Sequence, residues 1–344
     1  LKDSFANKLI EKSKEENAEF EVNMEMNDPA WDGEIRHLLK AIKILLGEDA
    51  NLDNPEINLN TVKNLSEDEI DKVLDSIIVS DTIIKKLVDI GADPEGSLVV
   101  RFEKTDPVWR KTDSAPGELK NFLTAAILLL DEEDNLNSSD AIKVSKIVQL
   151  LDEGEENIDT LSKSYLITDT AAKHLREMTA PGGSLYQVIY LPELTDDDYH
   201  GPAGEMKRFV LAADILLKDA GDDELENLEQ IKLGTFAGEN QKRMLASEIV
   251  KETIIRNIEI EAEKPGAVLK IAPELDRSAS GYQQEAWNNE LPLLLDAIIA
   301  ILGEDSTIDG LTVEEEDFLA LEDSKIDTIV ASRLVSYTAA KTIE

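Results

Sequence analysis

Hydrophobic residues along this chain follow two different periods in turn. In residues 35–46 they recur three and four positions apart, which is the spacing of an amphipathic helix with one buried face. In residues 18–26 apolar and polar side chains alternate strictly instead, which predicts a short β-strand. The chain therefore combines predicted helices with short extended segments.

Both patterns return at regular intervals along the chain. A glutamate leads the amphipathic stretch each time, and its four copies are 84, 87 and 85 residues apart (Glu34, Glu118, Glu205 and Glu290). A serine follows each glutamate after 42, 46, 42 and 42 residues, with a threonine six residues further on (Ser76 and Thr82, Ser164 and Thr170, Ser247 and Thr253, Ser332 and Thr338). A fixed period of this length indicates one folding unit copied in tandem.

Alternating segments separate the helical stretches of consecutive copies. They cover residues 18–26, 97–102, 184–190 and 267–271, and glycine or proline precedes three of the four. An aromatic residue then leads into the next amphipathic stretch (Trp31, Trp109, Tyr199 and Trp287). We therefore predict a mainly α fold, a tandem array of four helical modules of about 85 residues, each with one short connector β-strand.

The phase of the repeat defines the predicted module boundaries. Residues 1–28 form the tail of a preceding module, and modules follow at 29–105, 106–195, 196–276 and 277–344, of which the last lacks its strand. We expect the natural protein to continue in both directions. The alternative is head-to-tail polymerisation, in which a strand of the next molecule completes the fourth module.

Composition and charge narrow the function classes. The chain has 344 residues, of which 42% are hydrophobic, and a formal net charge of −38. A field of this sign repels phosphate backbones and anionic lipids, so we expect neither nucleic-acid nor membrane partners, whereas divalent cations are attracted. The absence of cysteine excludes disulfides and thiol-based sites, and no apolar run approaches the length of a membrane span.

One acidic loop has the spacing of a calcium-binding loop. Counted from Asp305, oxygen ligands fall at positions one, three and five (Asp305, Thr307 and Asp309), Gly310 stands at position six and Glu316 at position twelve. Calcium-binding loops between helices use this arrangement, in which the glycine makes the turn and the last glutamate chelates the ion. The loop therefore predicts a calcium site, with an acidic, solvated turn as the alternative.

Two recurring sets of side chains admit both a structural and a functional interpretation. The serines and threonines could form a recognition surface, but such residues in helices more often bond a neighbouring carbonyl and permit close packing. The junction aromatics could stack on a sugar or a peptide, or fill the space between modules as an apolar wedge. We favour packing in both cases.

No catalytic motif is present in the sequence. The three histidines, His37, His174 and His200, occupy different positions within the modules, and neither a nucleophile elbow nor a phosphate-binding glycine loop occurs. Carboxylate pairs carry no information because the chain contains 73 Asp and Glu residues. We therefore predict that the protein is not an enzyme.

The combination of an aromatic residue, a Glu-led helix, an acidic loop, a Ser/Thr-bearing helix and a short apolar segment resembles tandem helical repeats of large surface proteins of Firmicutes and of their wall-less relatives, the Mollicutes. The resemblance covers nearly the whole chain. It implies an extracellular structural role as a stalk, spacer or filament body of an adhesin-like protein, with neighbouring modules of the same or an adjacent chain as partners. The alternative is a calcium-stiffened module that binds a protein or glycan through acidic faces or junction aromatics.

Overall fold

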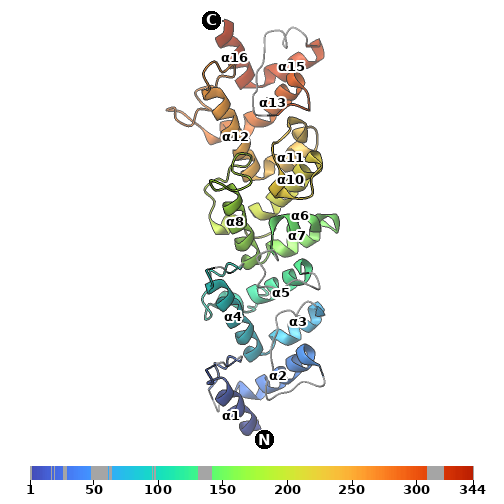
Figure 1. The fold of residues 1–344 in the computed structure, drawn as a ribbon, viewed down its shortest axis with the longest axis vertical. Helices are drawn as coiled ribbons and strands as arrows, with labels where there is room; N and C mark the ends of the chain where they lie inside the picture. The colour runs from blue at the N-terminus through green and yellow to red at the C-terminus, as the bar shows by residue number, and fades with distance from the viewer. Residues whose placement is uncertain are drawn as a thin grey trace. The chain divides into compact units, whose positions relative to one another are not determined.

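The computed structural model describes residues 2–16, 18, 20–25, 29–47, 61, 64–94, 96, 98–130, 142–307 and 321–343 (Figure 1). In these residues the protein is mainly α-helical, with fifteen α-helices and no β-strand. None of the described helices has both the length and the apolar composition needed to cross a membrane. The backbone divides into two compact units, Leu1–His174 with Tyr199–Gly204, and Leu175–Asp198 with Glu205–Glu344.

The first unit is built from helices that pack mainly on their neighbours in sequence (Figure 1). Helix α2 contacts α3 and α4, α3 also contacts α5, and α5 contacts α7. The α-helices are α1 (Lys2–Lys12), α2 (Trp31–Leu46), α3 (Glu67–Leu74), α4 (Ile77–Ala92), α5 (Glu118–Leu129), α6 (Val144–Gln149), α7 (Glu155–Ser162) and the start of α8 (Tyr165–Thr179), with 3-10 turns η2 (Pro107–Trp109) and η3 (Leu150–Asp152).

The second unit follows the same local pattern of contacts. Helix α10 contacts α11 and α12, and α13 contacts α15 and α16. The helices are α9 (Asp196–Tyr199), α10 (Glu205–Ala220), α11 (Asn240–Ala246), α12 (Glu248–Glu263), α13 (Gln284–Leu302), α15 (Asp323–Ala331) and α16 (Arg333–Ile343), with 3-10 turns η4 (Leu225–Asn227) and η5 (Leu233–Phe236).

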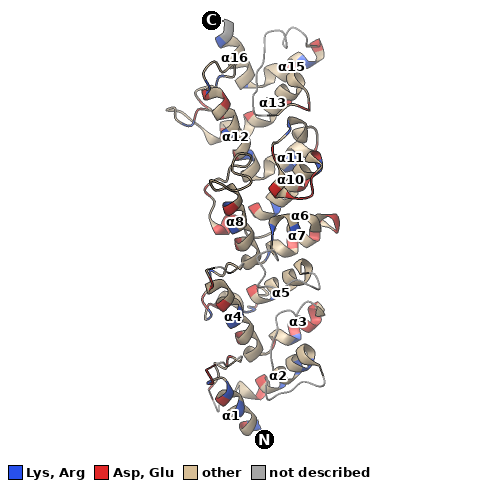
Figure 2. Ribbon diagram, viewed as in Figure 1, with Lys and Arg blue, Asp and Glu red and all other residues tan. Residues whose placement is uncertain are grey.

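The amphipathic helix predicted for residues 35–46 is confirmed as part of α2. Leu38, Ile42 and Leu45 are buried, whereas Leu39, on the other side of the helix, is 44% exposed. Acidic and basic residues are interspersed along the helices of both units, as the colours of the ribbon in Figure 2 show. The burial of one apolar face of α2 is the packing that period-3.6 sequences are expected to give.

The predicted connector strands are wrong for the residues that the structure describes. The described parts of 18–26, 97–102, 184–190 and 267–271 are irregular or turn-like, and the one isolated β-bridge joins Lys232 to Thr307 elsewhere. Each segment instead buries apolar side chains in the core, one in three of the segments (Phe20, Leu98 and Leu269) and two in 184–190 (Leu185 and Ile189). The backbone of each segment bonds to a helix side chain rather than to another strand.

Candidate functional site

The glutamate that leads each amphipathic stretch is buried and accepts hydrogen bonds from the start of a later helix. In α2, one carboxylate oxygen of Glu34 accepts from the Ser76 hydroxyl at 2.6 Å and from the N–H of Ile78 at 3.0 Å. The other oxygen accepts from the N–H of Ile77 at 2.9 Å. Ser76 in turn accepts from the N–H of Val79 at 3.2 Å, so the first turn of α4 is fully bonded.

The same arrangement occurs at three further places. Each glutamate accepts from one serine hydroxyl and from the two N–H groups that follow it, at distances of 2.6–3.0 Å. The pairs are Glu118 with Ser164, Glu205 with Ser247 and Glu290 with Ser332. All four glutamates are at most 3% exposed, and all four serines are fully buried. We call this set of bonds the carboxylate cap.

The carboxylate cap stabilises a helix N-terminus in two ways. The first N–H groups of a helix have no partner within the helix, and the aligned peptide dipoles make that end partly positive. A carboxylate satisfies the free N–H groups and places negative charge where the dipole favours it. Because the carboxylate comes from a different helix, the cap also joins two helices that lie more than 40 residues apart in sequence.

Glycine precedes two of the capping glutamates where the backbone passes close to another segment. A Cβ atom on Gly117, whose φ is +84°, would lie 2.4 Å from the carbonyl carbon of Arg110. On Gly204 it would lie 2.3 Å from the carbonyl oxygen of His200. These close approaches fix where α5 and α10 begin, and with them the position of Glu118 and Glu205.

Burial raises the pKa of two of these carboxyl groups. Burial raises the pKa of Glu118 from 4.5 to about 7, against the opposing effect of the bonds from Leu166, Ser164 and Tyr165. Burial likewise raises the pKa of Glu205, and the bonds from the start of α12 again oppose it. Removing a carboxylate from water penalises its charged form, which is the physical cause in both cases.

The threonine of each copy holds one of the irregular segments between the helices. The Thr82 hydroxyl accepts the N–H of Glu21 at 3.1 Å and donates to the carbonyl of Ile78 at 2.8 Å. The equivalent N–H bonds run from Val99 to Thr170, from Tyr190 to Thr253 and from Lys270 to Thr338, at 2.9–3.0 Å. We call each such bond a threonine clamp. The packing role predicted for these residues is confirmed for Thr82, Thr170 and Thr253, which bond the carbonyl four residues earlier.

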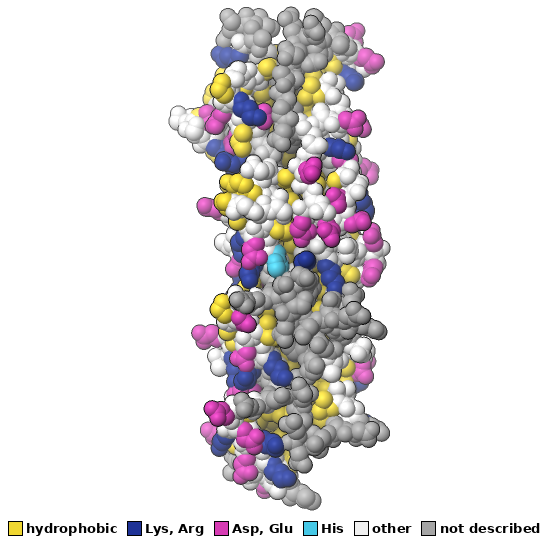
Figure 3. All heavy atoms as spheres, in the orientation of Figure 1, with side chains coloured by type: hydrophobic (Ala, Val, Ile, Leu, Met, Phe, Trp, Pro, Cys, Tyr) yellow, Lys and Arg dark blue, Asp and Glu magenta, His cyan; other side chains and the backbone are white. Residues whose placement is uncertain are grey.

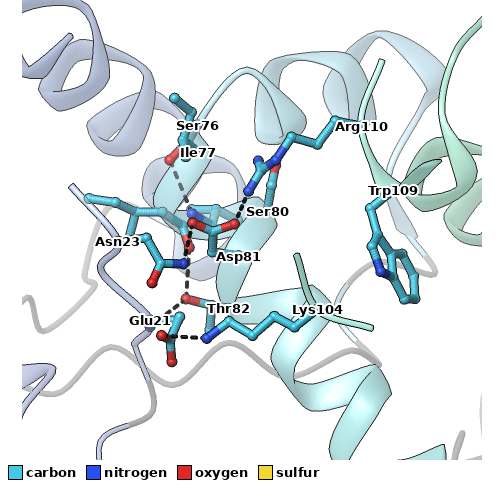
Figure 4. Close-up of polar contacts among 12 residues, drawn as sticks. Glu21, Asn23, Ser76, Ile77, Ser80, Asp81, Thr82, Lys104, Trp109 and Arg110 are labelled. Carbon is cyan, nitrogen blue, oxygen red and sulfur yellow. Dashed lines mark hydrogen bonds and ion pairs between the residues drawn. The ribbon is translucent and has the colours of Figure 1, made fainter. Parts of the chain in front are cut away.

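A carboxylate beside the threonine adds ion pairs to the same contact. Asp81 accepts from the Asn23 amide at 2.9 Å and pairs with Arg110, while Glu21 pairs with Lys104 (Figure 4). Helix α4 is thereby bound to a segment that precedes it and to one that follows it. The corresponding pairs elsewhere are Asp169 with Arg101 at 3.2 Å and Glu252 with Arg277 at 2.7 Å.

The four junction aromatics are buried, with at most 4% exposure (Trp31, Trp109, Tyr199 and Trp287). The indole N–H of each tryptophan donates to a backbone carbonyl, at 2.6 Å for Trp31, 2.9 Å for Trp109 and 2.8 Å for Trp287. A ligand would find no free ring face on these residues. Their burial favours the wedge interpretation over stacking on a sugar or peptide.

The predicted calcium loop is only partly covered by the described residues. Asp305 is exposed, and Thr307 forms the bridge to Lys232, next to a 2.7 Å bond from the N–H of Leu233 to the carbonyl of Ser306. The other two ligands, Asp309 and Glu316, lie outside the described residues. The calcium site therefore stays a prediction.

Truncating a capping glutamate should destabilise the protein strongly. Glu205→Ala leaves one hydroxyl and two N–H groups without an acceptor in a buried place, for which we expect a loss of about 3 kcal/mol in the free energy of unfolding. Glu239→Ala is the control, because Glu239 is exposed and makes no cap bond, and we expect a change below about 0.5 kcal/mol. Urea titration measures both. Equal losses would show that the cap contributes nothing.

The raised pKa of Glu118 predicts a pH dependence of stability. Because its folded pKa exceeds the unfolded value of 4.5, its contribution is complete below that value and is lost as the pH rises through about 7. Between those limits we expect a loss of roughly 3 kcal/mol. Glu118→Gln should remove this part of the slope in urea titrations across that range, whereas Glu153→Gln, at an exposed position, should retain it. Identical slopes in all three proteins would contradict the prediction.

No family model, no curated protein and no solved structure matches the chain. Function is therefore inferred from the carboxylate caps, the threonine clamps and the segments that they join.

Proposed function

We propose that the chain is a structural repeat segment, serving as a stalk, spacer or filament body of an extracellular bacterial surface or adhesin-like protein. Its units are the four helical modules at 29–105, 106–195, 196–276 and 277–344, preceded by the tail at 1–28. Neighbouring modules, in the same or an adjacent chain, are the principal partners.

One observation carries this proposal: the carboxylate caps lie within modules, whereas the threonine clamps lie between them. With these boundaries, every carboxylate cap joins two helices of one module, as between Glu34 and Ser76. Every threonine clamp joins consecutive modules instead, because Glu21, Val99, Tyr190 and Lys270 each bond to the threonine of the next module. The cap thus closes each module, and the clamp links it to its neighbour.

Contacts of this kind suit a protein whose task is to span distance. A chain in which each repeat bonds only to its neighbours can be lengthened by copying the repeat, without redesigning a shared core. Ion pairs across the same junctions, such as Asp81 with Arg110, reinforce the link.

The extracellular location is supported by composition and by the resemblance to surface-protein repeats. The net charge of −38 favours solubility over binding to nucleic acid or anionic lipid. The calcium-stiffened binding module remains the alternative, but the burial of the junction aromatics removes one of the surfaces that it required.

Small-angle X-ray scattering of the whole chain tests the spacer proposal. Modules that contact only their neighbours should scatter as an elongated particle of nearly constant cross-section. Scattering typical of a compact globule would contradict the proposal.

Weakening one threonine clamp should loosen one junction and leave the helix intact. Thr253→Val keeps the shape of the side chain but removes the acceptor of the Tyr190 N–H, so we expect the Tyr190 amide to exchange its hydrogen faster, by about tenfold for a loss of 1.4 kcal/mol. Thr179→Val is the control, because the Thr179 hydroxyl donates to carbonyls of its own helix, those of Leu175 and Arg176. Hydrogen exchange at the Tyr190 amide, measured in both variants, tests whether the clamp protects it. An unchanged exchange rate of the Tyr190 amide in Thr253→Val would show that the clamp does not stabilise the junction.

A further inference from the structure

A groove in the second unit exposes aromatic side chains that the spacer role does not need. Tyr186 is 48% exposed, Tyr190 38% and Ile260 44%, which places them among the most exposed large hydrophobic residues described. They line a groove of about 710 Å³ between residues 186–191 and helix α12. Figure 3 shows hydrophobic side chains reaching the surface on the face that carries α12.

The ring of Tyr190 belongs to a segment that is already fixed in place. Its backbone N–H donates to Thr253 at 2.9 Å, and its carbonyl accepts from the same hydroxyl at 3.2 Å. The guanidinium of Arg256 lies 5.3 Å from the ring centroid. These bonds hold the backbone that carries the ring, so a stacking ligand has to order only the side chain, which lowers the cost of binding.

The groove also offers hydrogen-bonding groups that have no partner in the described part of the chain. The side-chain amides of Gln187 and Asn257 and the carboxylate of Glu229 line it, and no described residue bonds to any of the three. Each amide provides both a donor and an acceptor, and the carboxylate provides acceptors only. A ligand that fits must therefore supply donors as well as acceptors along its length.

The charges in the groove nearly cancel, in contrast with the rest of the chain. Arg176 pairs with Asp196 at 2.7 Å, and Lys264 pairs with Glu261. Three basic residues and two acidic ones line the groove, within a chain whose net charge is −38. An anionic ligand would meet cations that are largely neutralised and a repelling field around them, so a neutral ligand fits better.

We propose that this groove binds a neutral oligosaccharide. The apolar C–H face of a sugar ring can stack on Tyr186 and Tyr190, while its hydroxyls donate to Glu229 and exchange bonds with Gln187 and Asn257. A proline-rich peptide also suits a tyrosine-lined groove, but its proline residues lack N–H donors for these acceptors. The binding site holds whether or not the chain acts as a spacer.

Calorimetric titration of the whole chain with four neutral probes tests the proposal: cellohexaose, hexa-N-acetylchitohexaose, xylohexaose and maltohexaose. We expect at least one to bind with one-to-one stoichiometry. Tyr190→Ala and Asn257→Ala should each weaken that binding by about tenfold, which corresponds to 1.4 kcal/mol. Tyr282→Ala is the matched control, because Tyr282 lies in the same unit but does not line the groove, and it should bind as the unaltered chain does.

Two results would overturn the proposal. One is the absence of binding by all four probes at millimolar concentration. The other is binding that survives unchanged in both Tyr190→Ala and Asn257→Ala, since it would then occur elsewhere on the chain. Thermal melting of the variants shows whether they fold, and Asn257→Ala keeps the test valid if Tyr190→Ala disturbs the clamp at Thr253. A proline-rich peptide that binds in a Tyr190-dependent manner, while no sugar binds, would also contradict it.

Discussion

A buried carboxylate at the start of a helix is the interaction on which the rest of this structure depends. Burying an ionised carboxylate is costly unless its oxygens are bonded, and each of these four receives three hydrogen bonds. The donors are groups that would otherwise be unsatisfied at the helix end. The glutamate and the helix therefore satisfy each other, and neither is stable in the core alone. This mutual need explains why the glutamate and the serine recur together in all four copies, although the interval between them is 46 residues in one copy and 42 in the other three.

The caps place the helices that carry the threonines, and those helices then receive the connecting segments. Thr82 and Asp81 are adjacent on α4, so one short stretch of helix binds a backbone N–H, the Asn23 amide and the Arg110 guanidinium. Directional bonds of this kind specify one arrangement of segments whose apolar residues could pack in several ways. In a strongly acidic chain they also offset the repulsion among like charges. In the proposed repeat organisation, each of these connections joins consecutive modules.

The sequence predicted the helices and the recurring residues. It did not predict the bonds between those residues or the irregular connecting segments, and the reasons can be identified. The amphipathic helices and the recurrence of Glu34 and Ser76 follow from spacing alone. The bond between them does not, because spacing reveals that two residues recur together but not that they touch. The strands were wrong because the alternation around Phe20 and Leu98 reflects burial against a helix, which period-2 patterns cannot distinguish from pairing in a sheet. The Asp81–Arg110 pair could not be identified among 73 acidic residues.

Native-state hydrogen exchange at the capped helix starts tests the central claim most directly. First-turn amides normally exchange fast because they lack partners within the helix. If the carboxylate caps hold, the amides of Ile77 and Ile78, and their counterparts at the starts of α8, α12 and α16, should exchange about as slowly as helix interiors. The first-turn amides of α11, whose N-cap Glu239 makes no side-chain bond, should exchange fast. Equal, fast exchange at all five helix starts would contradict the account.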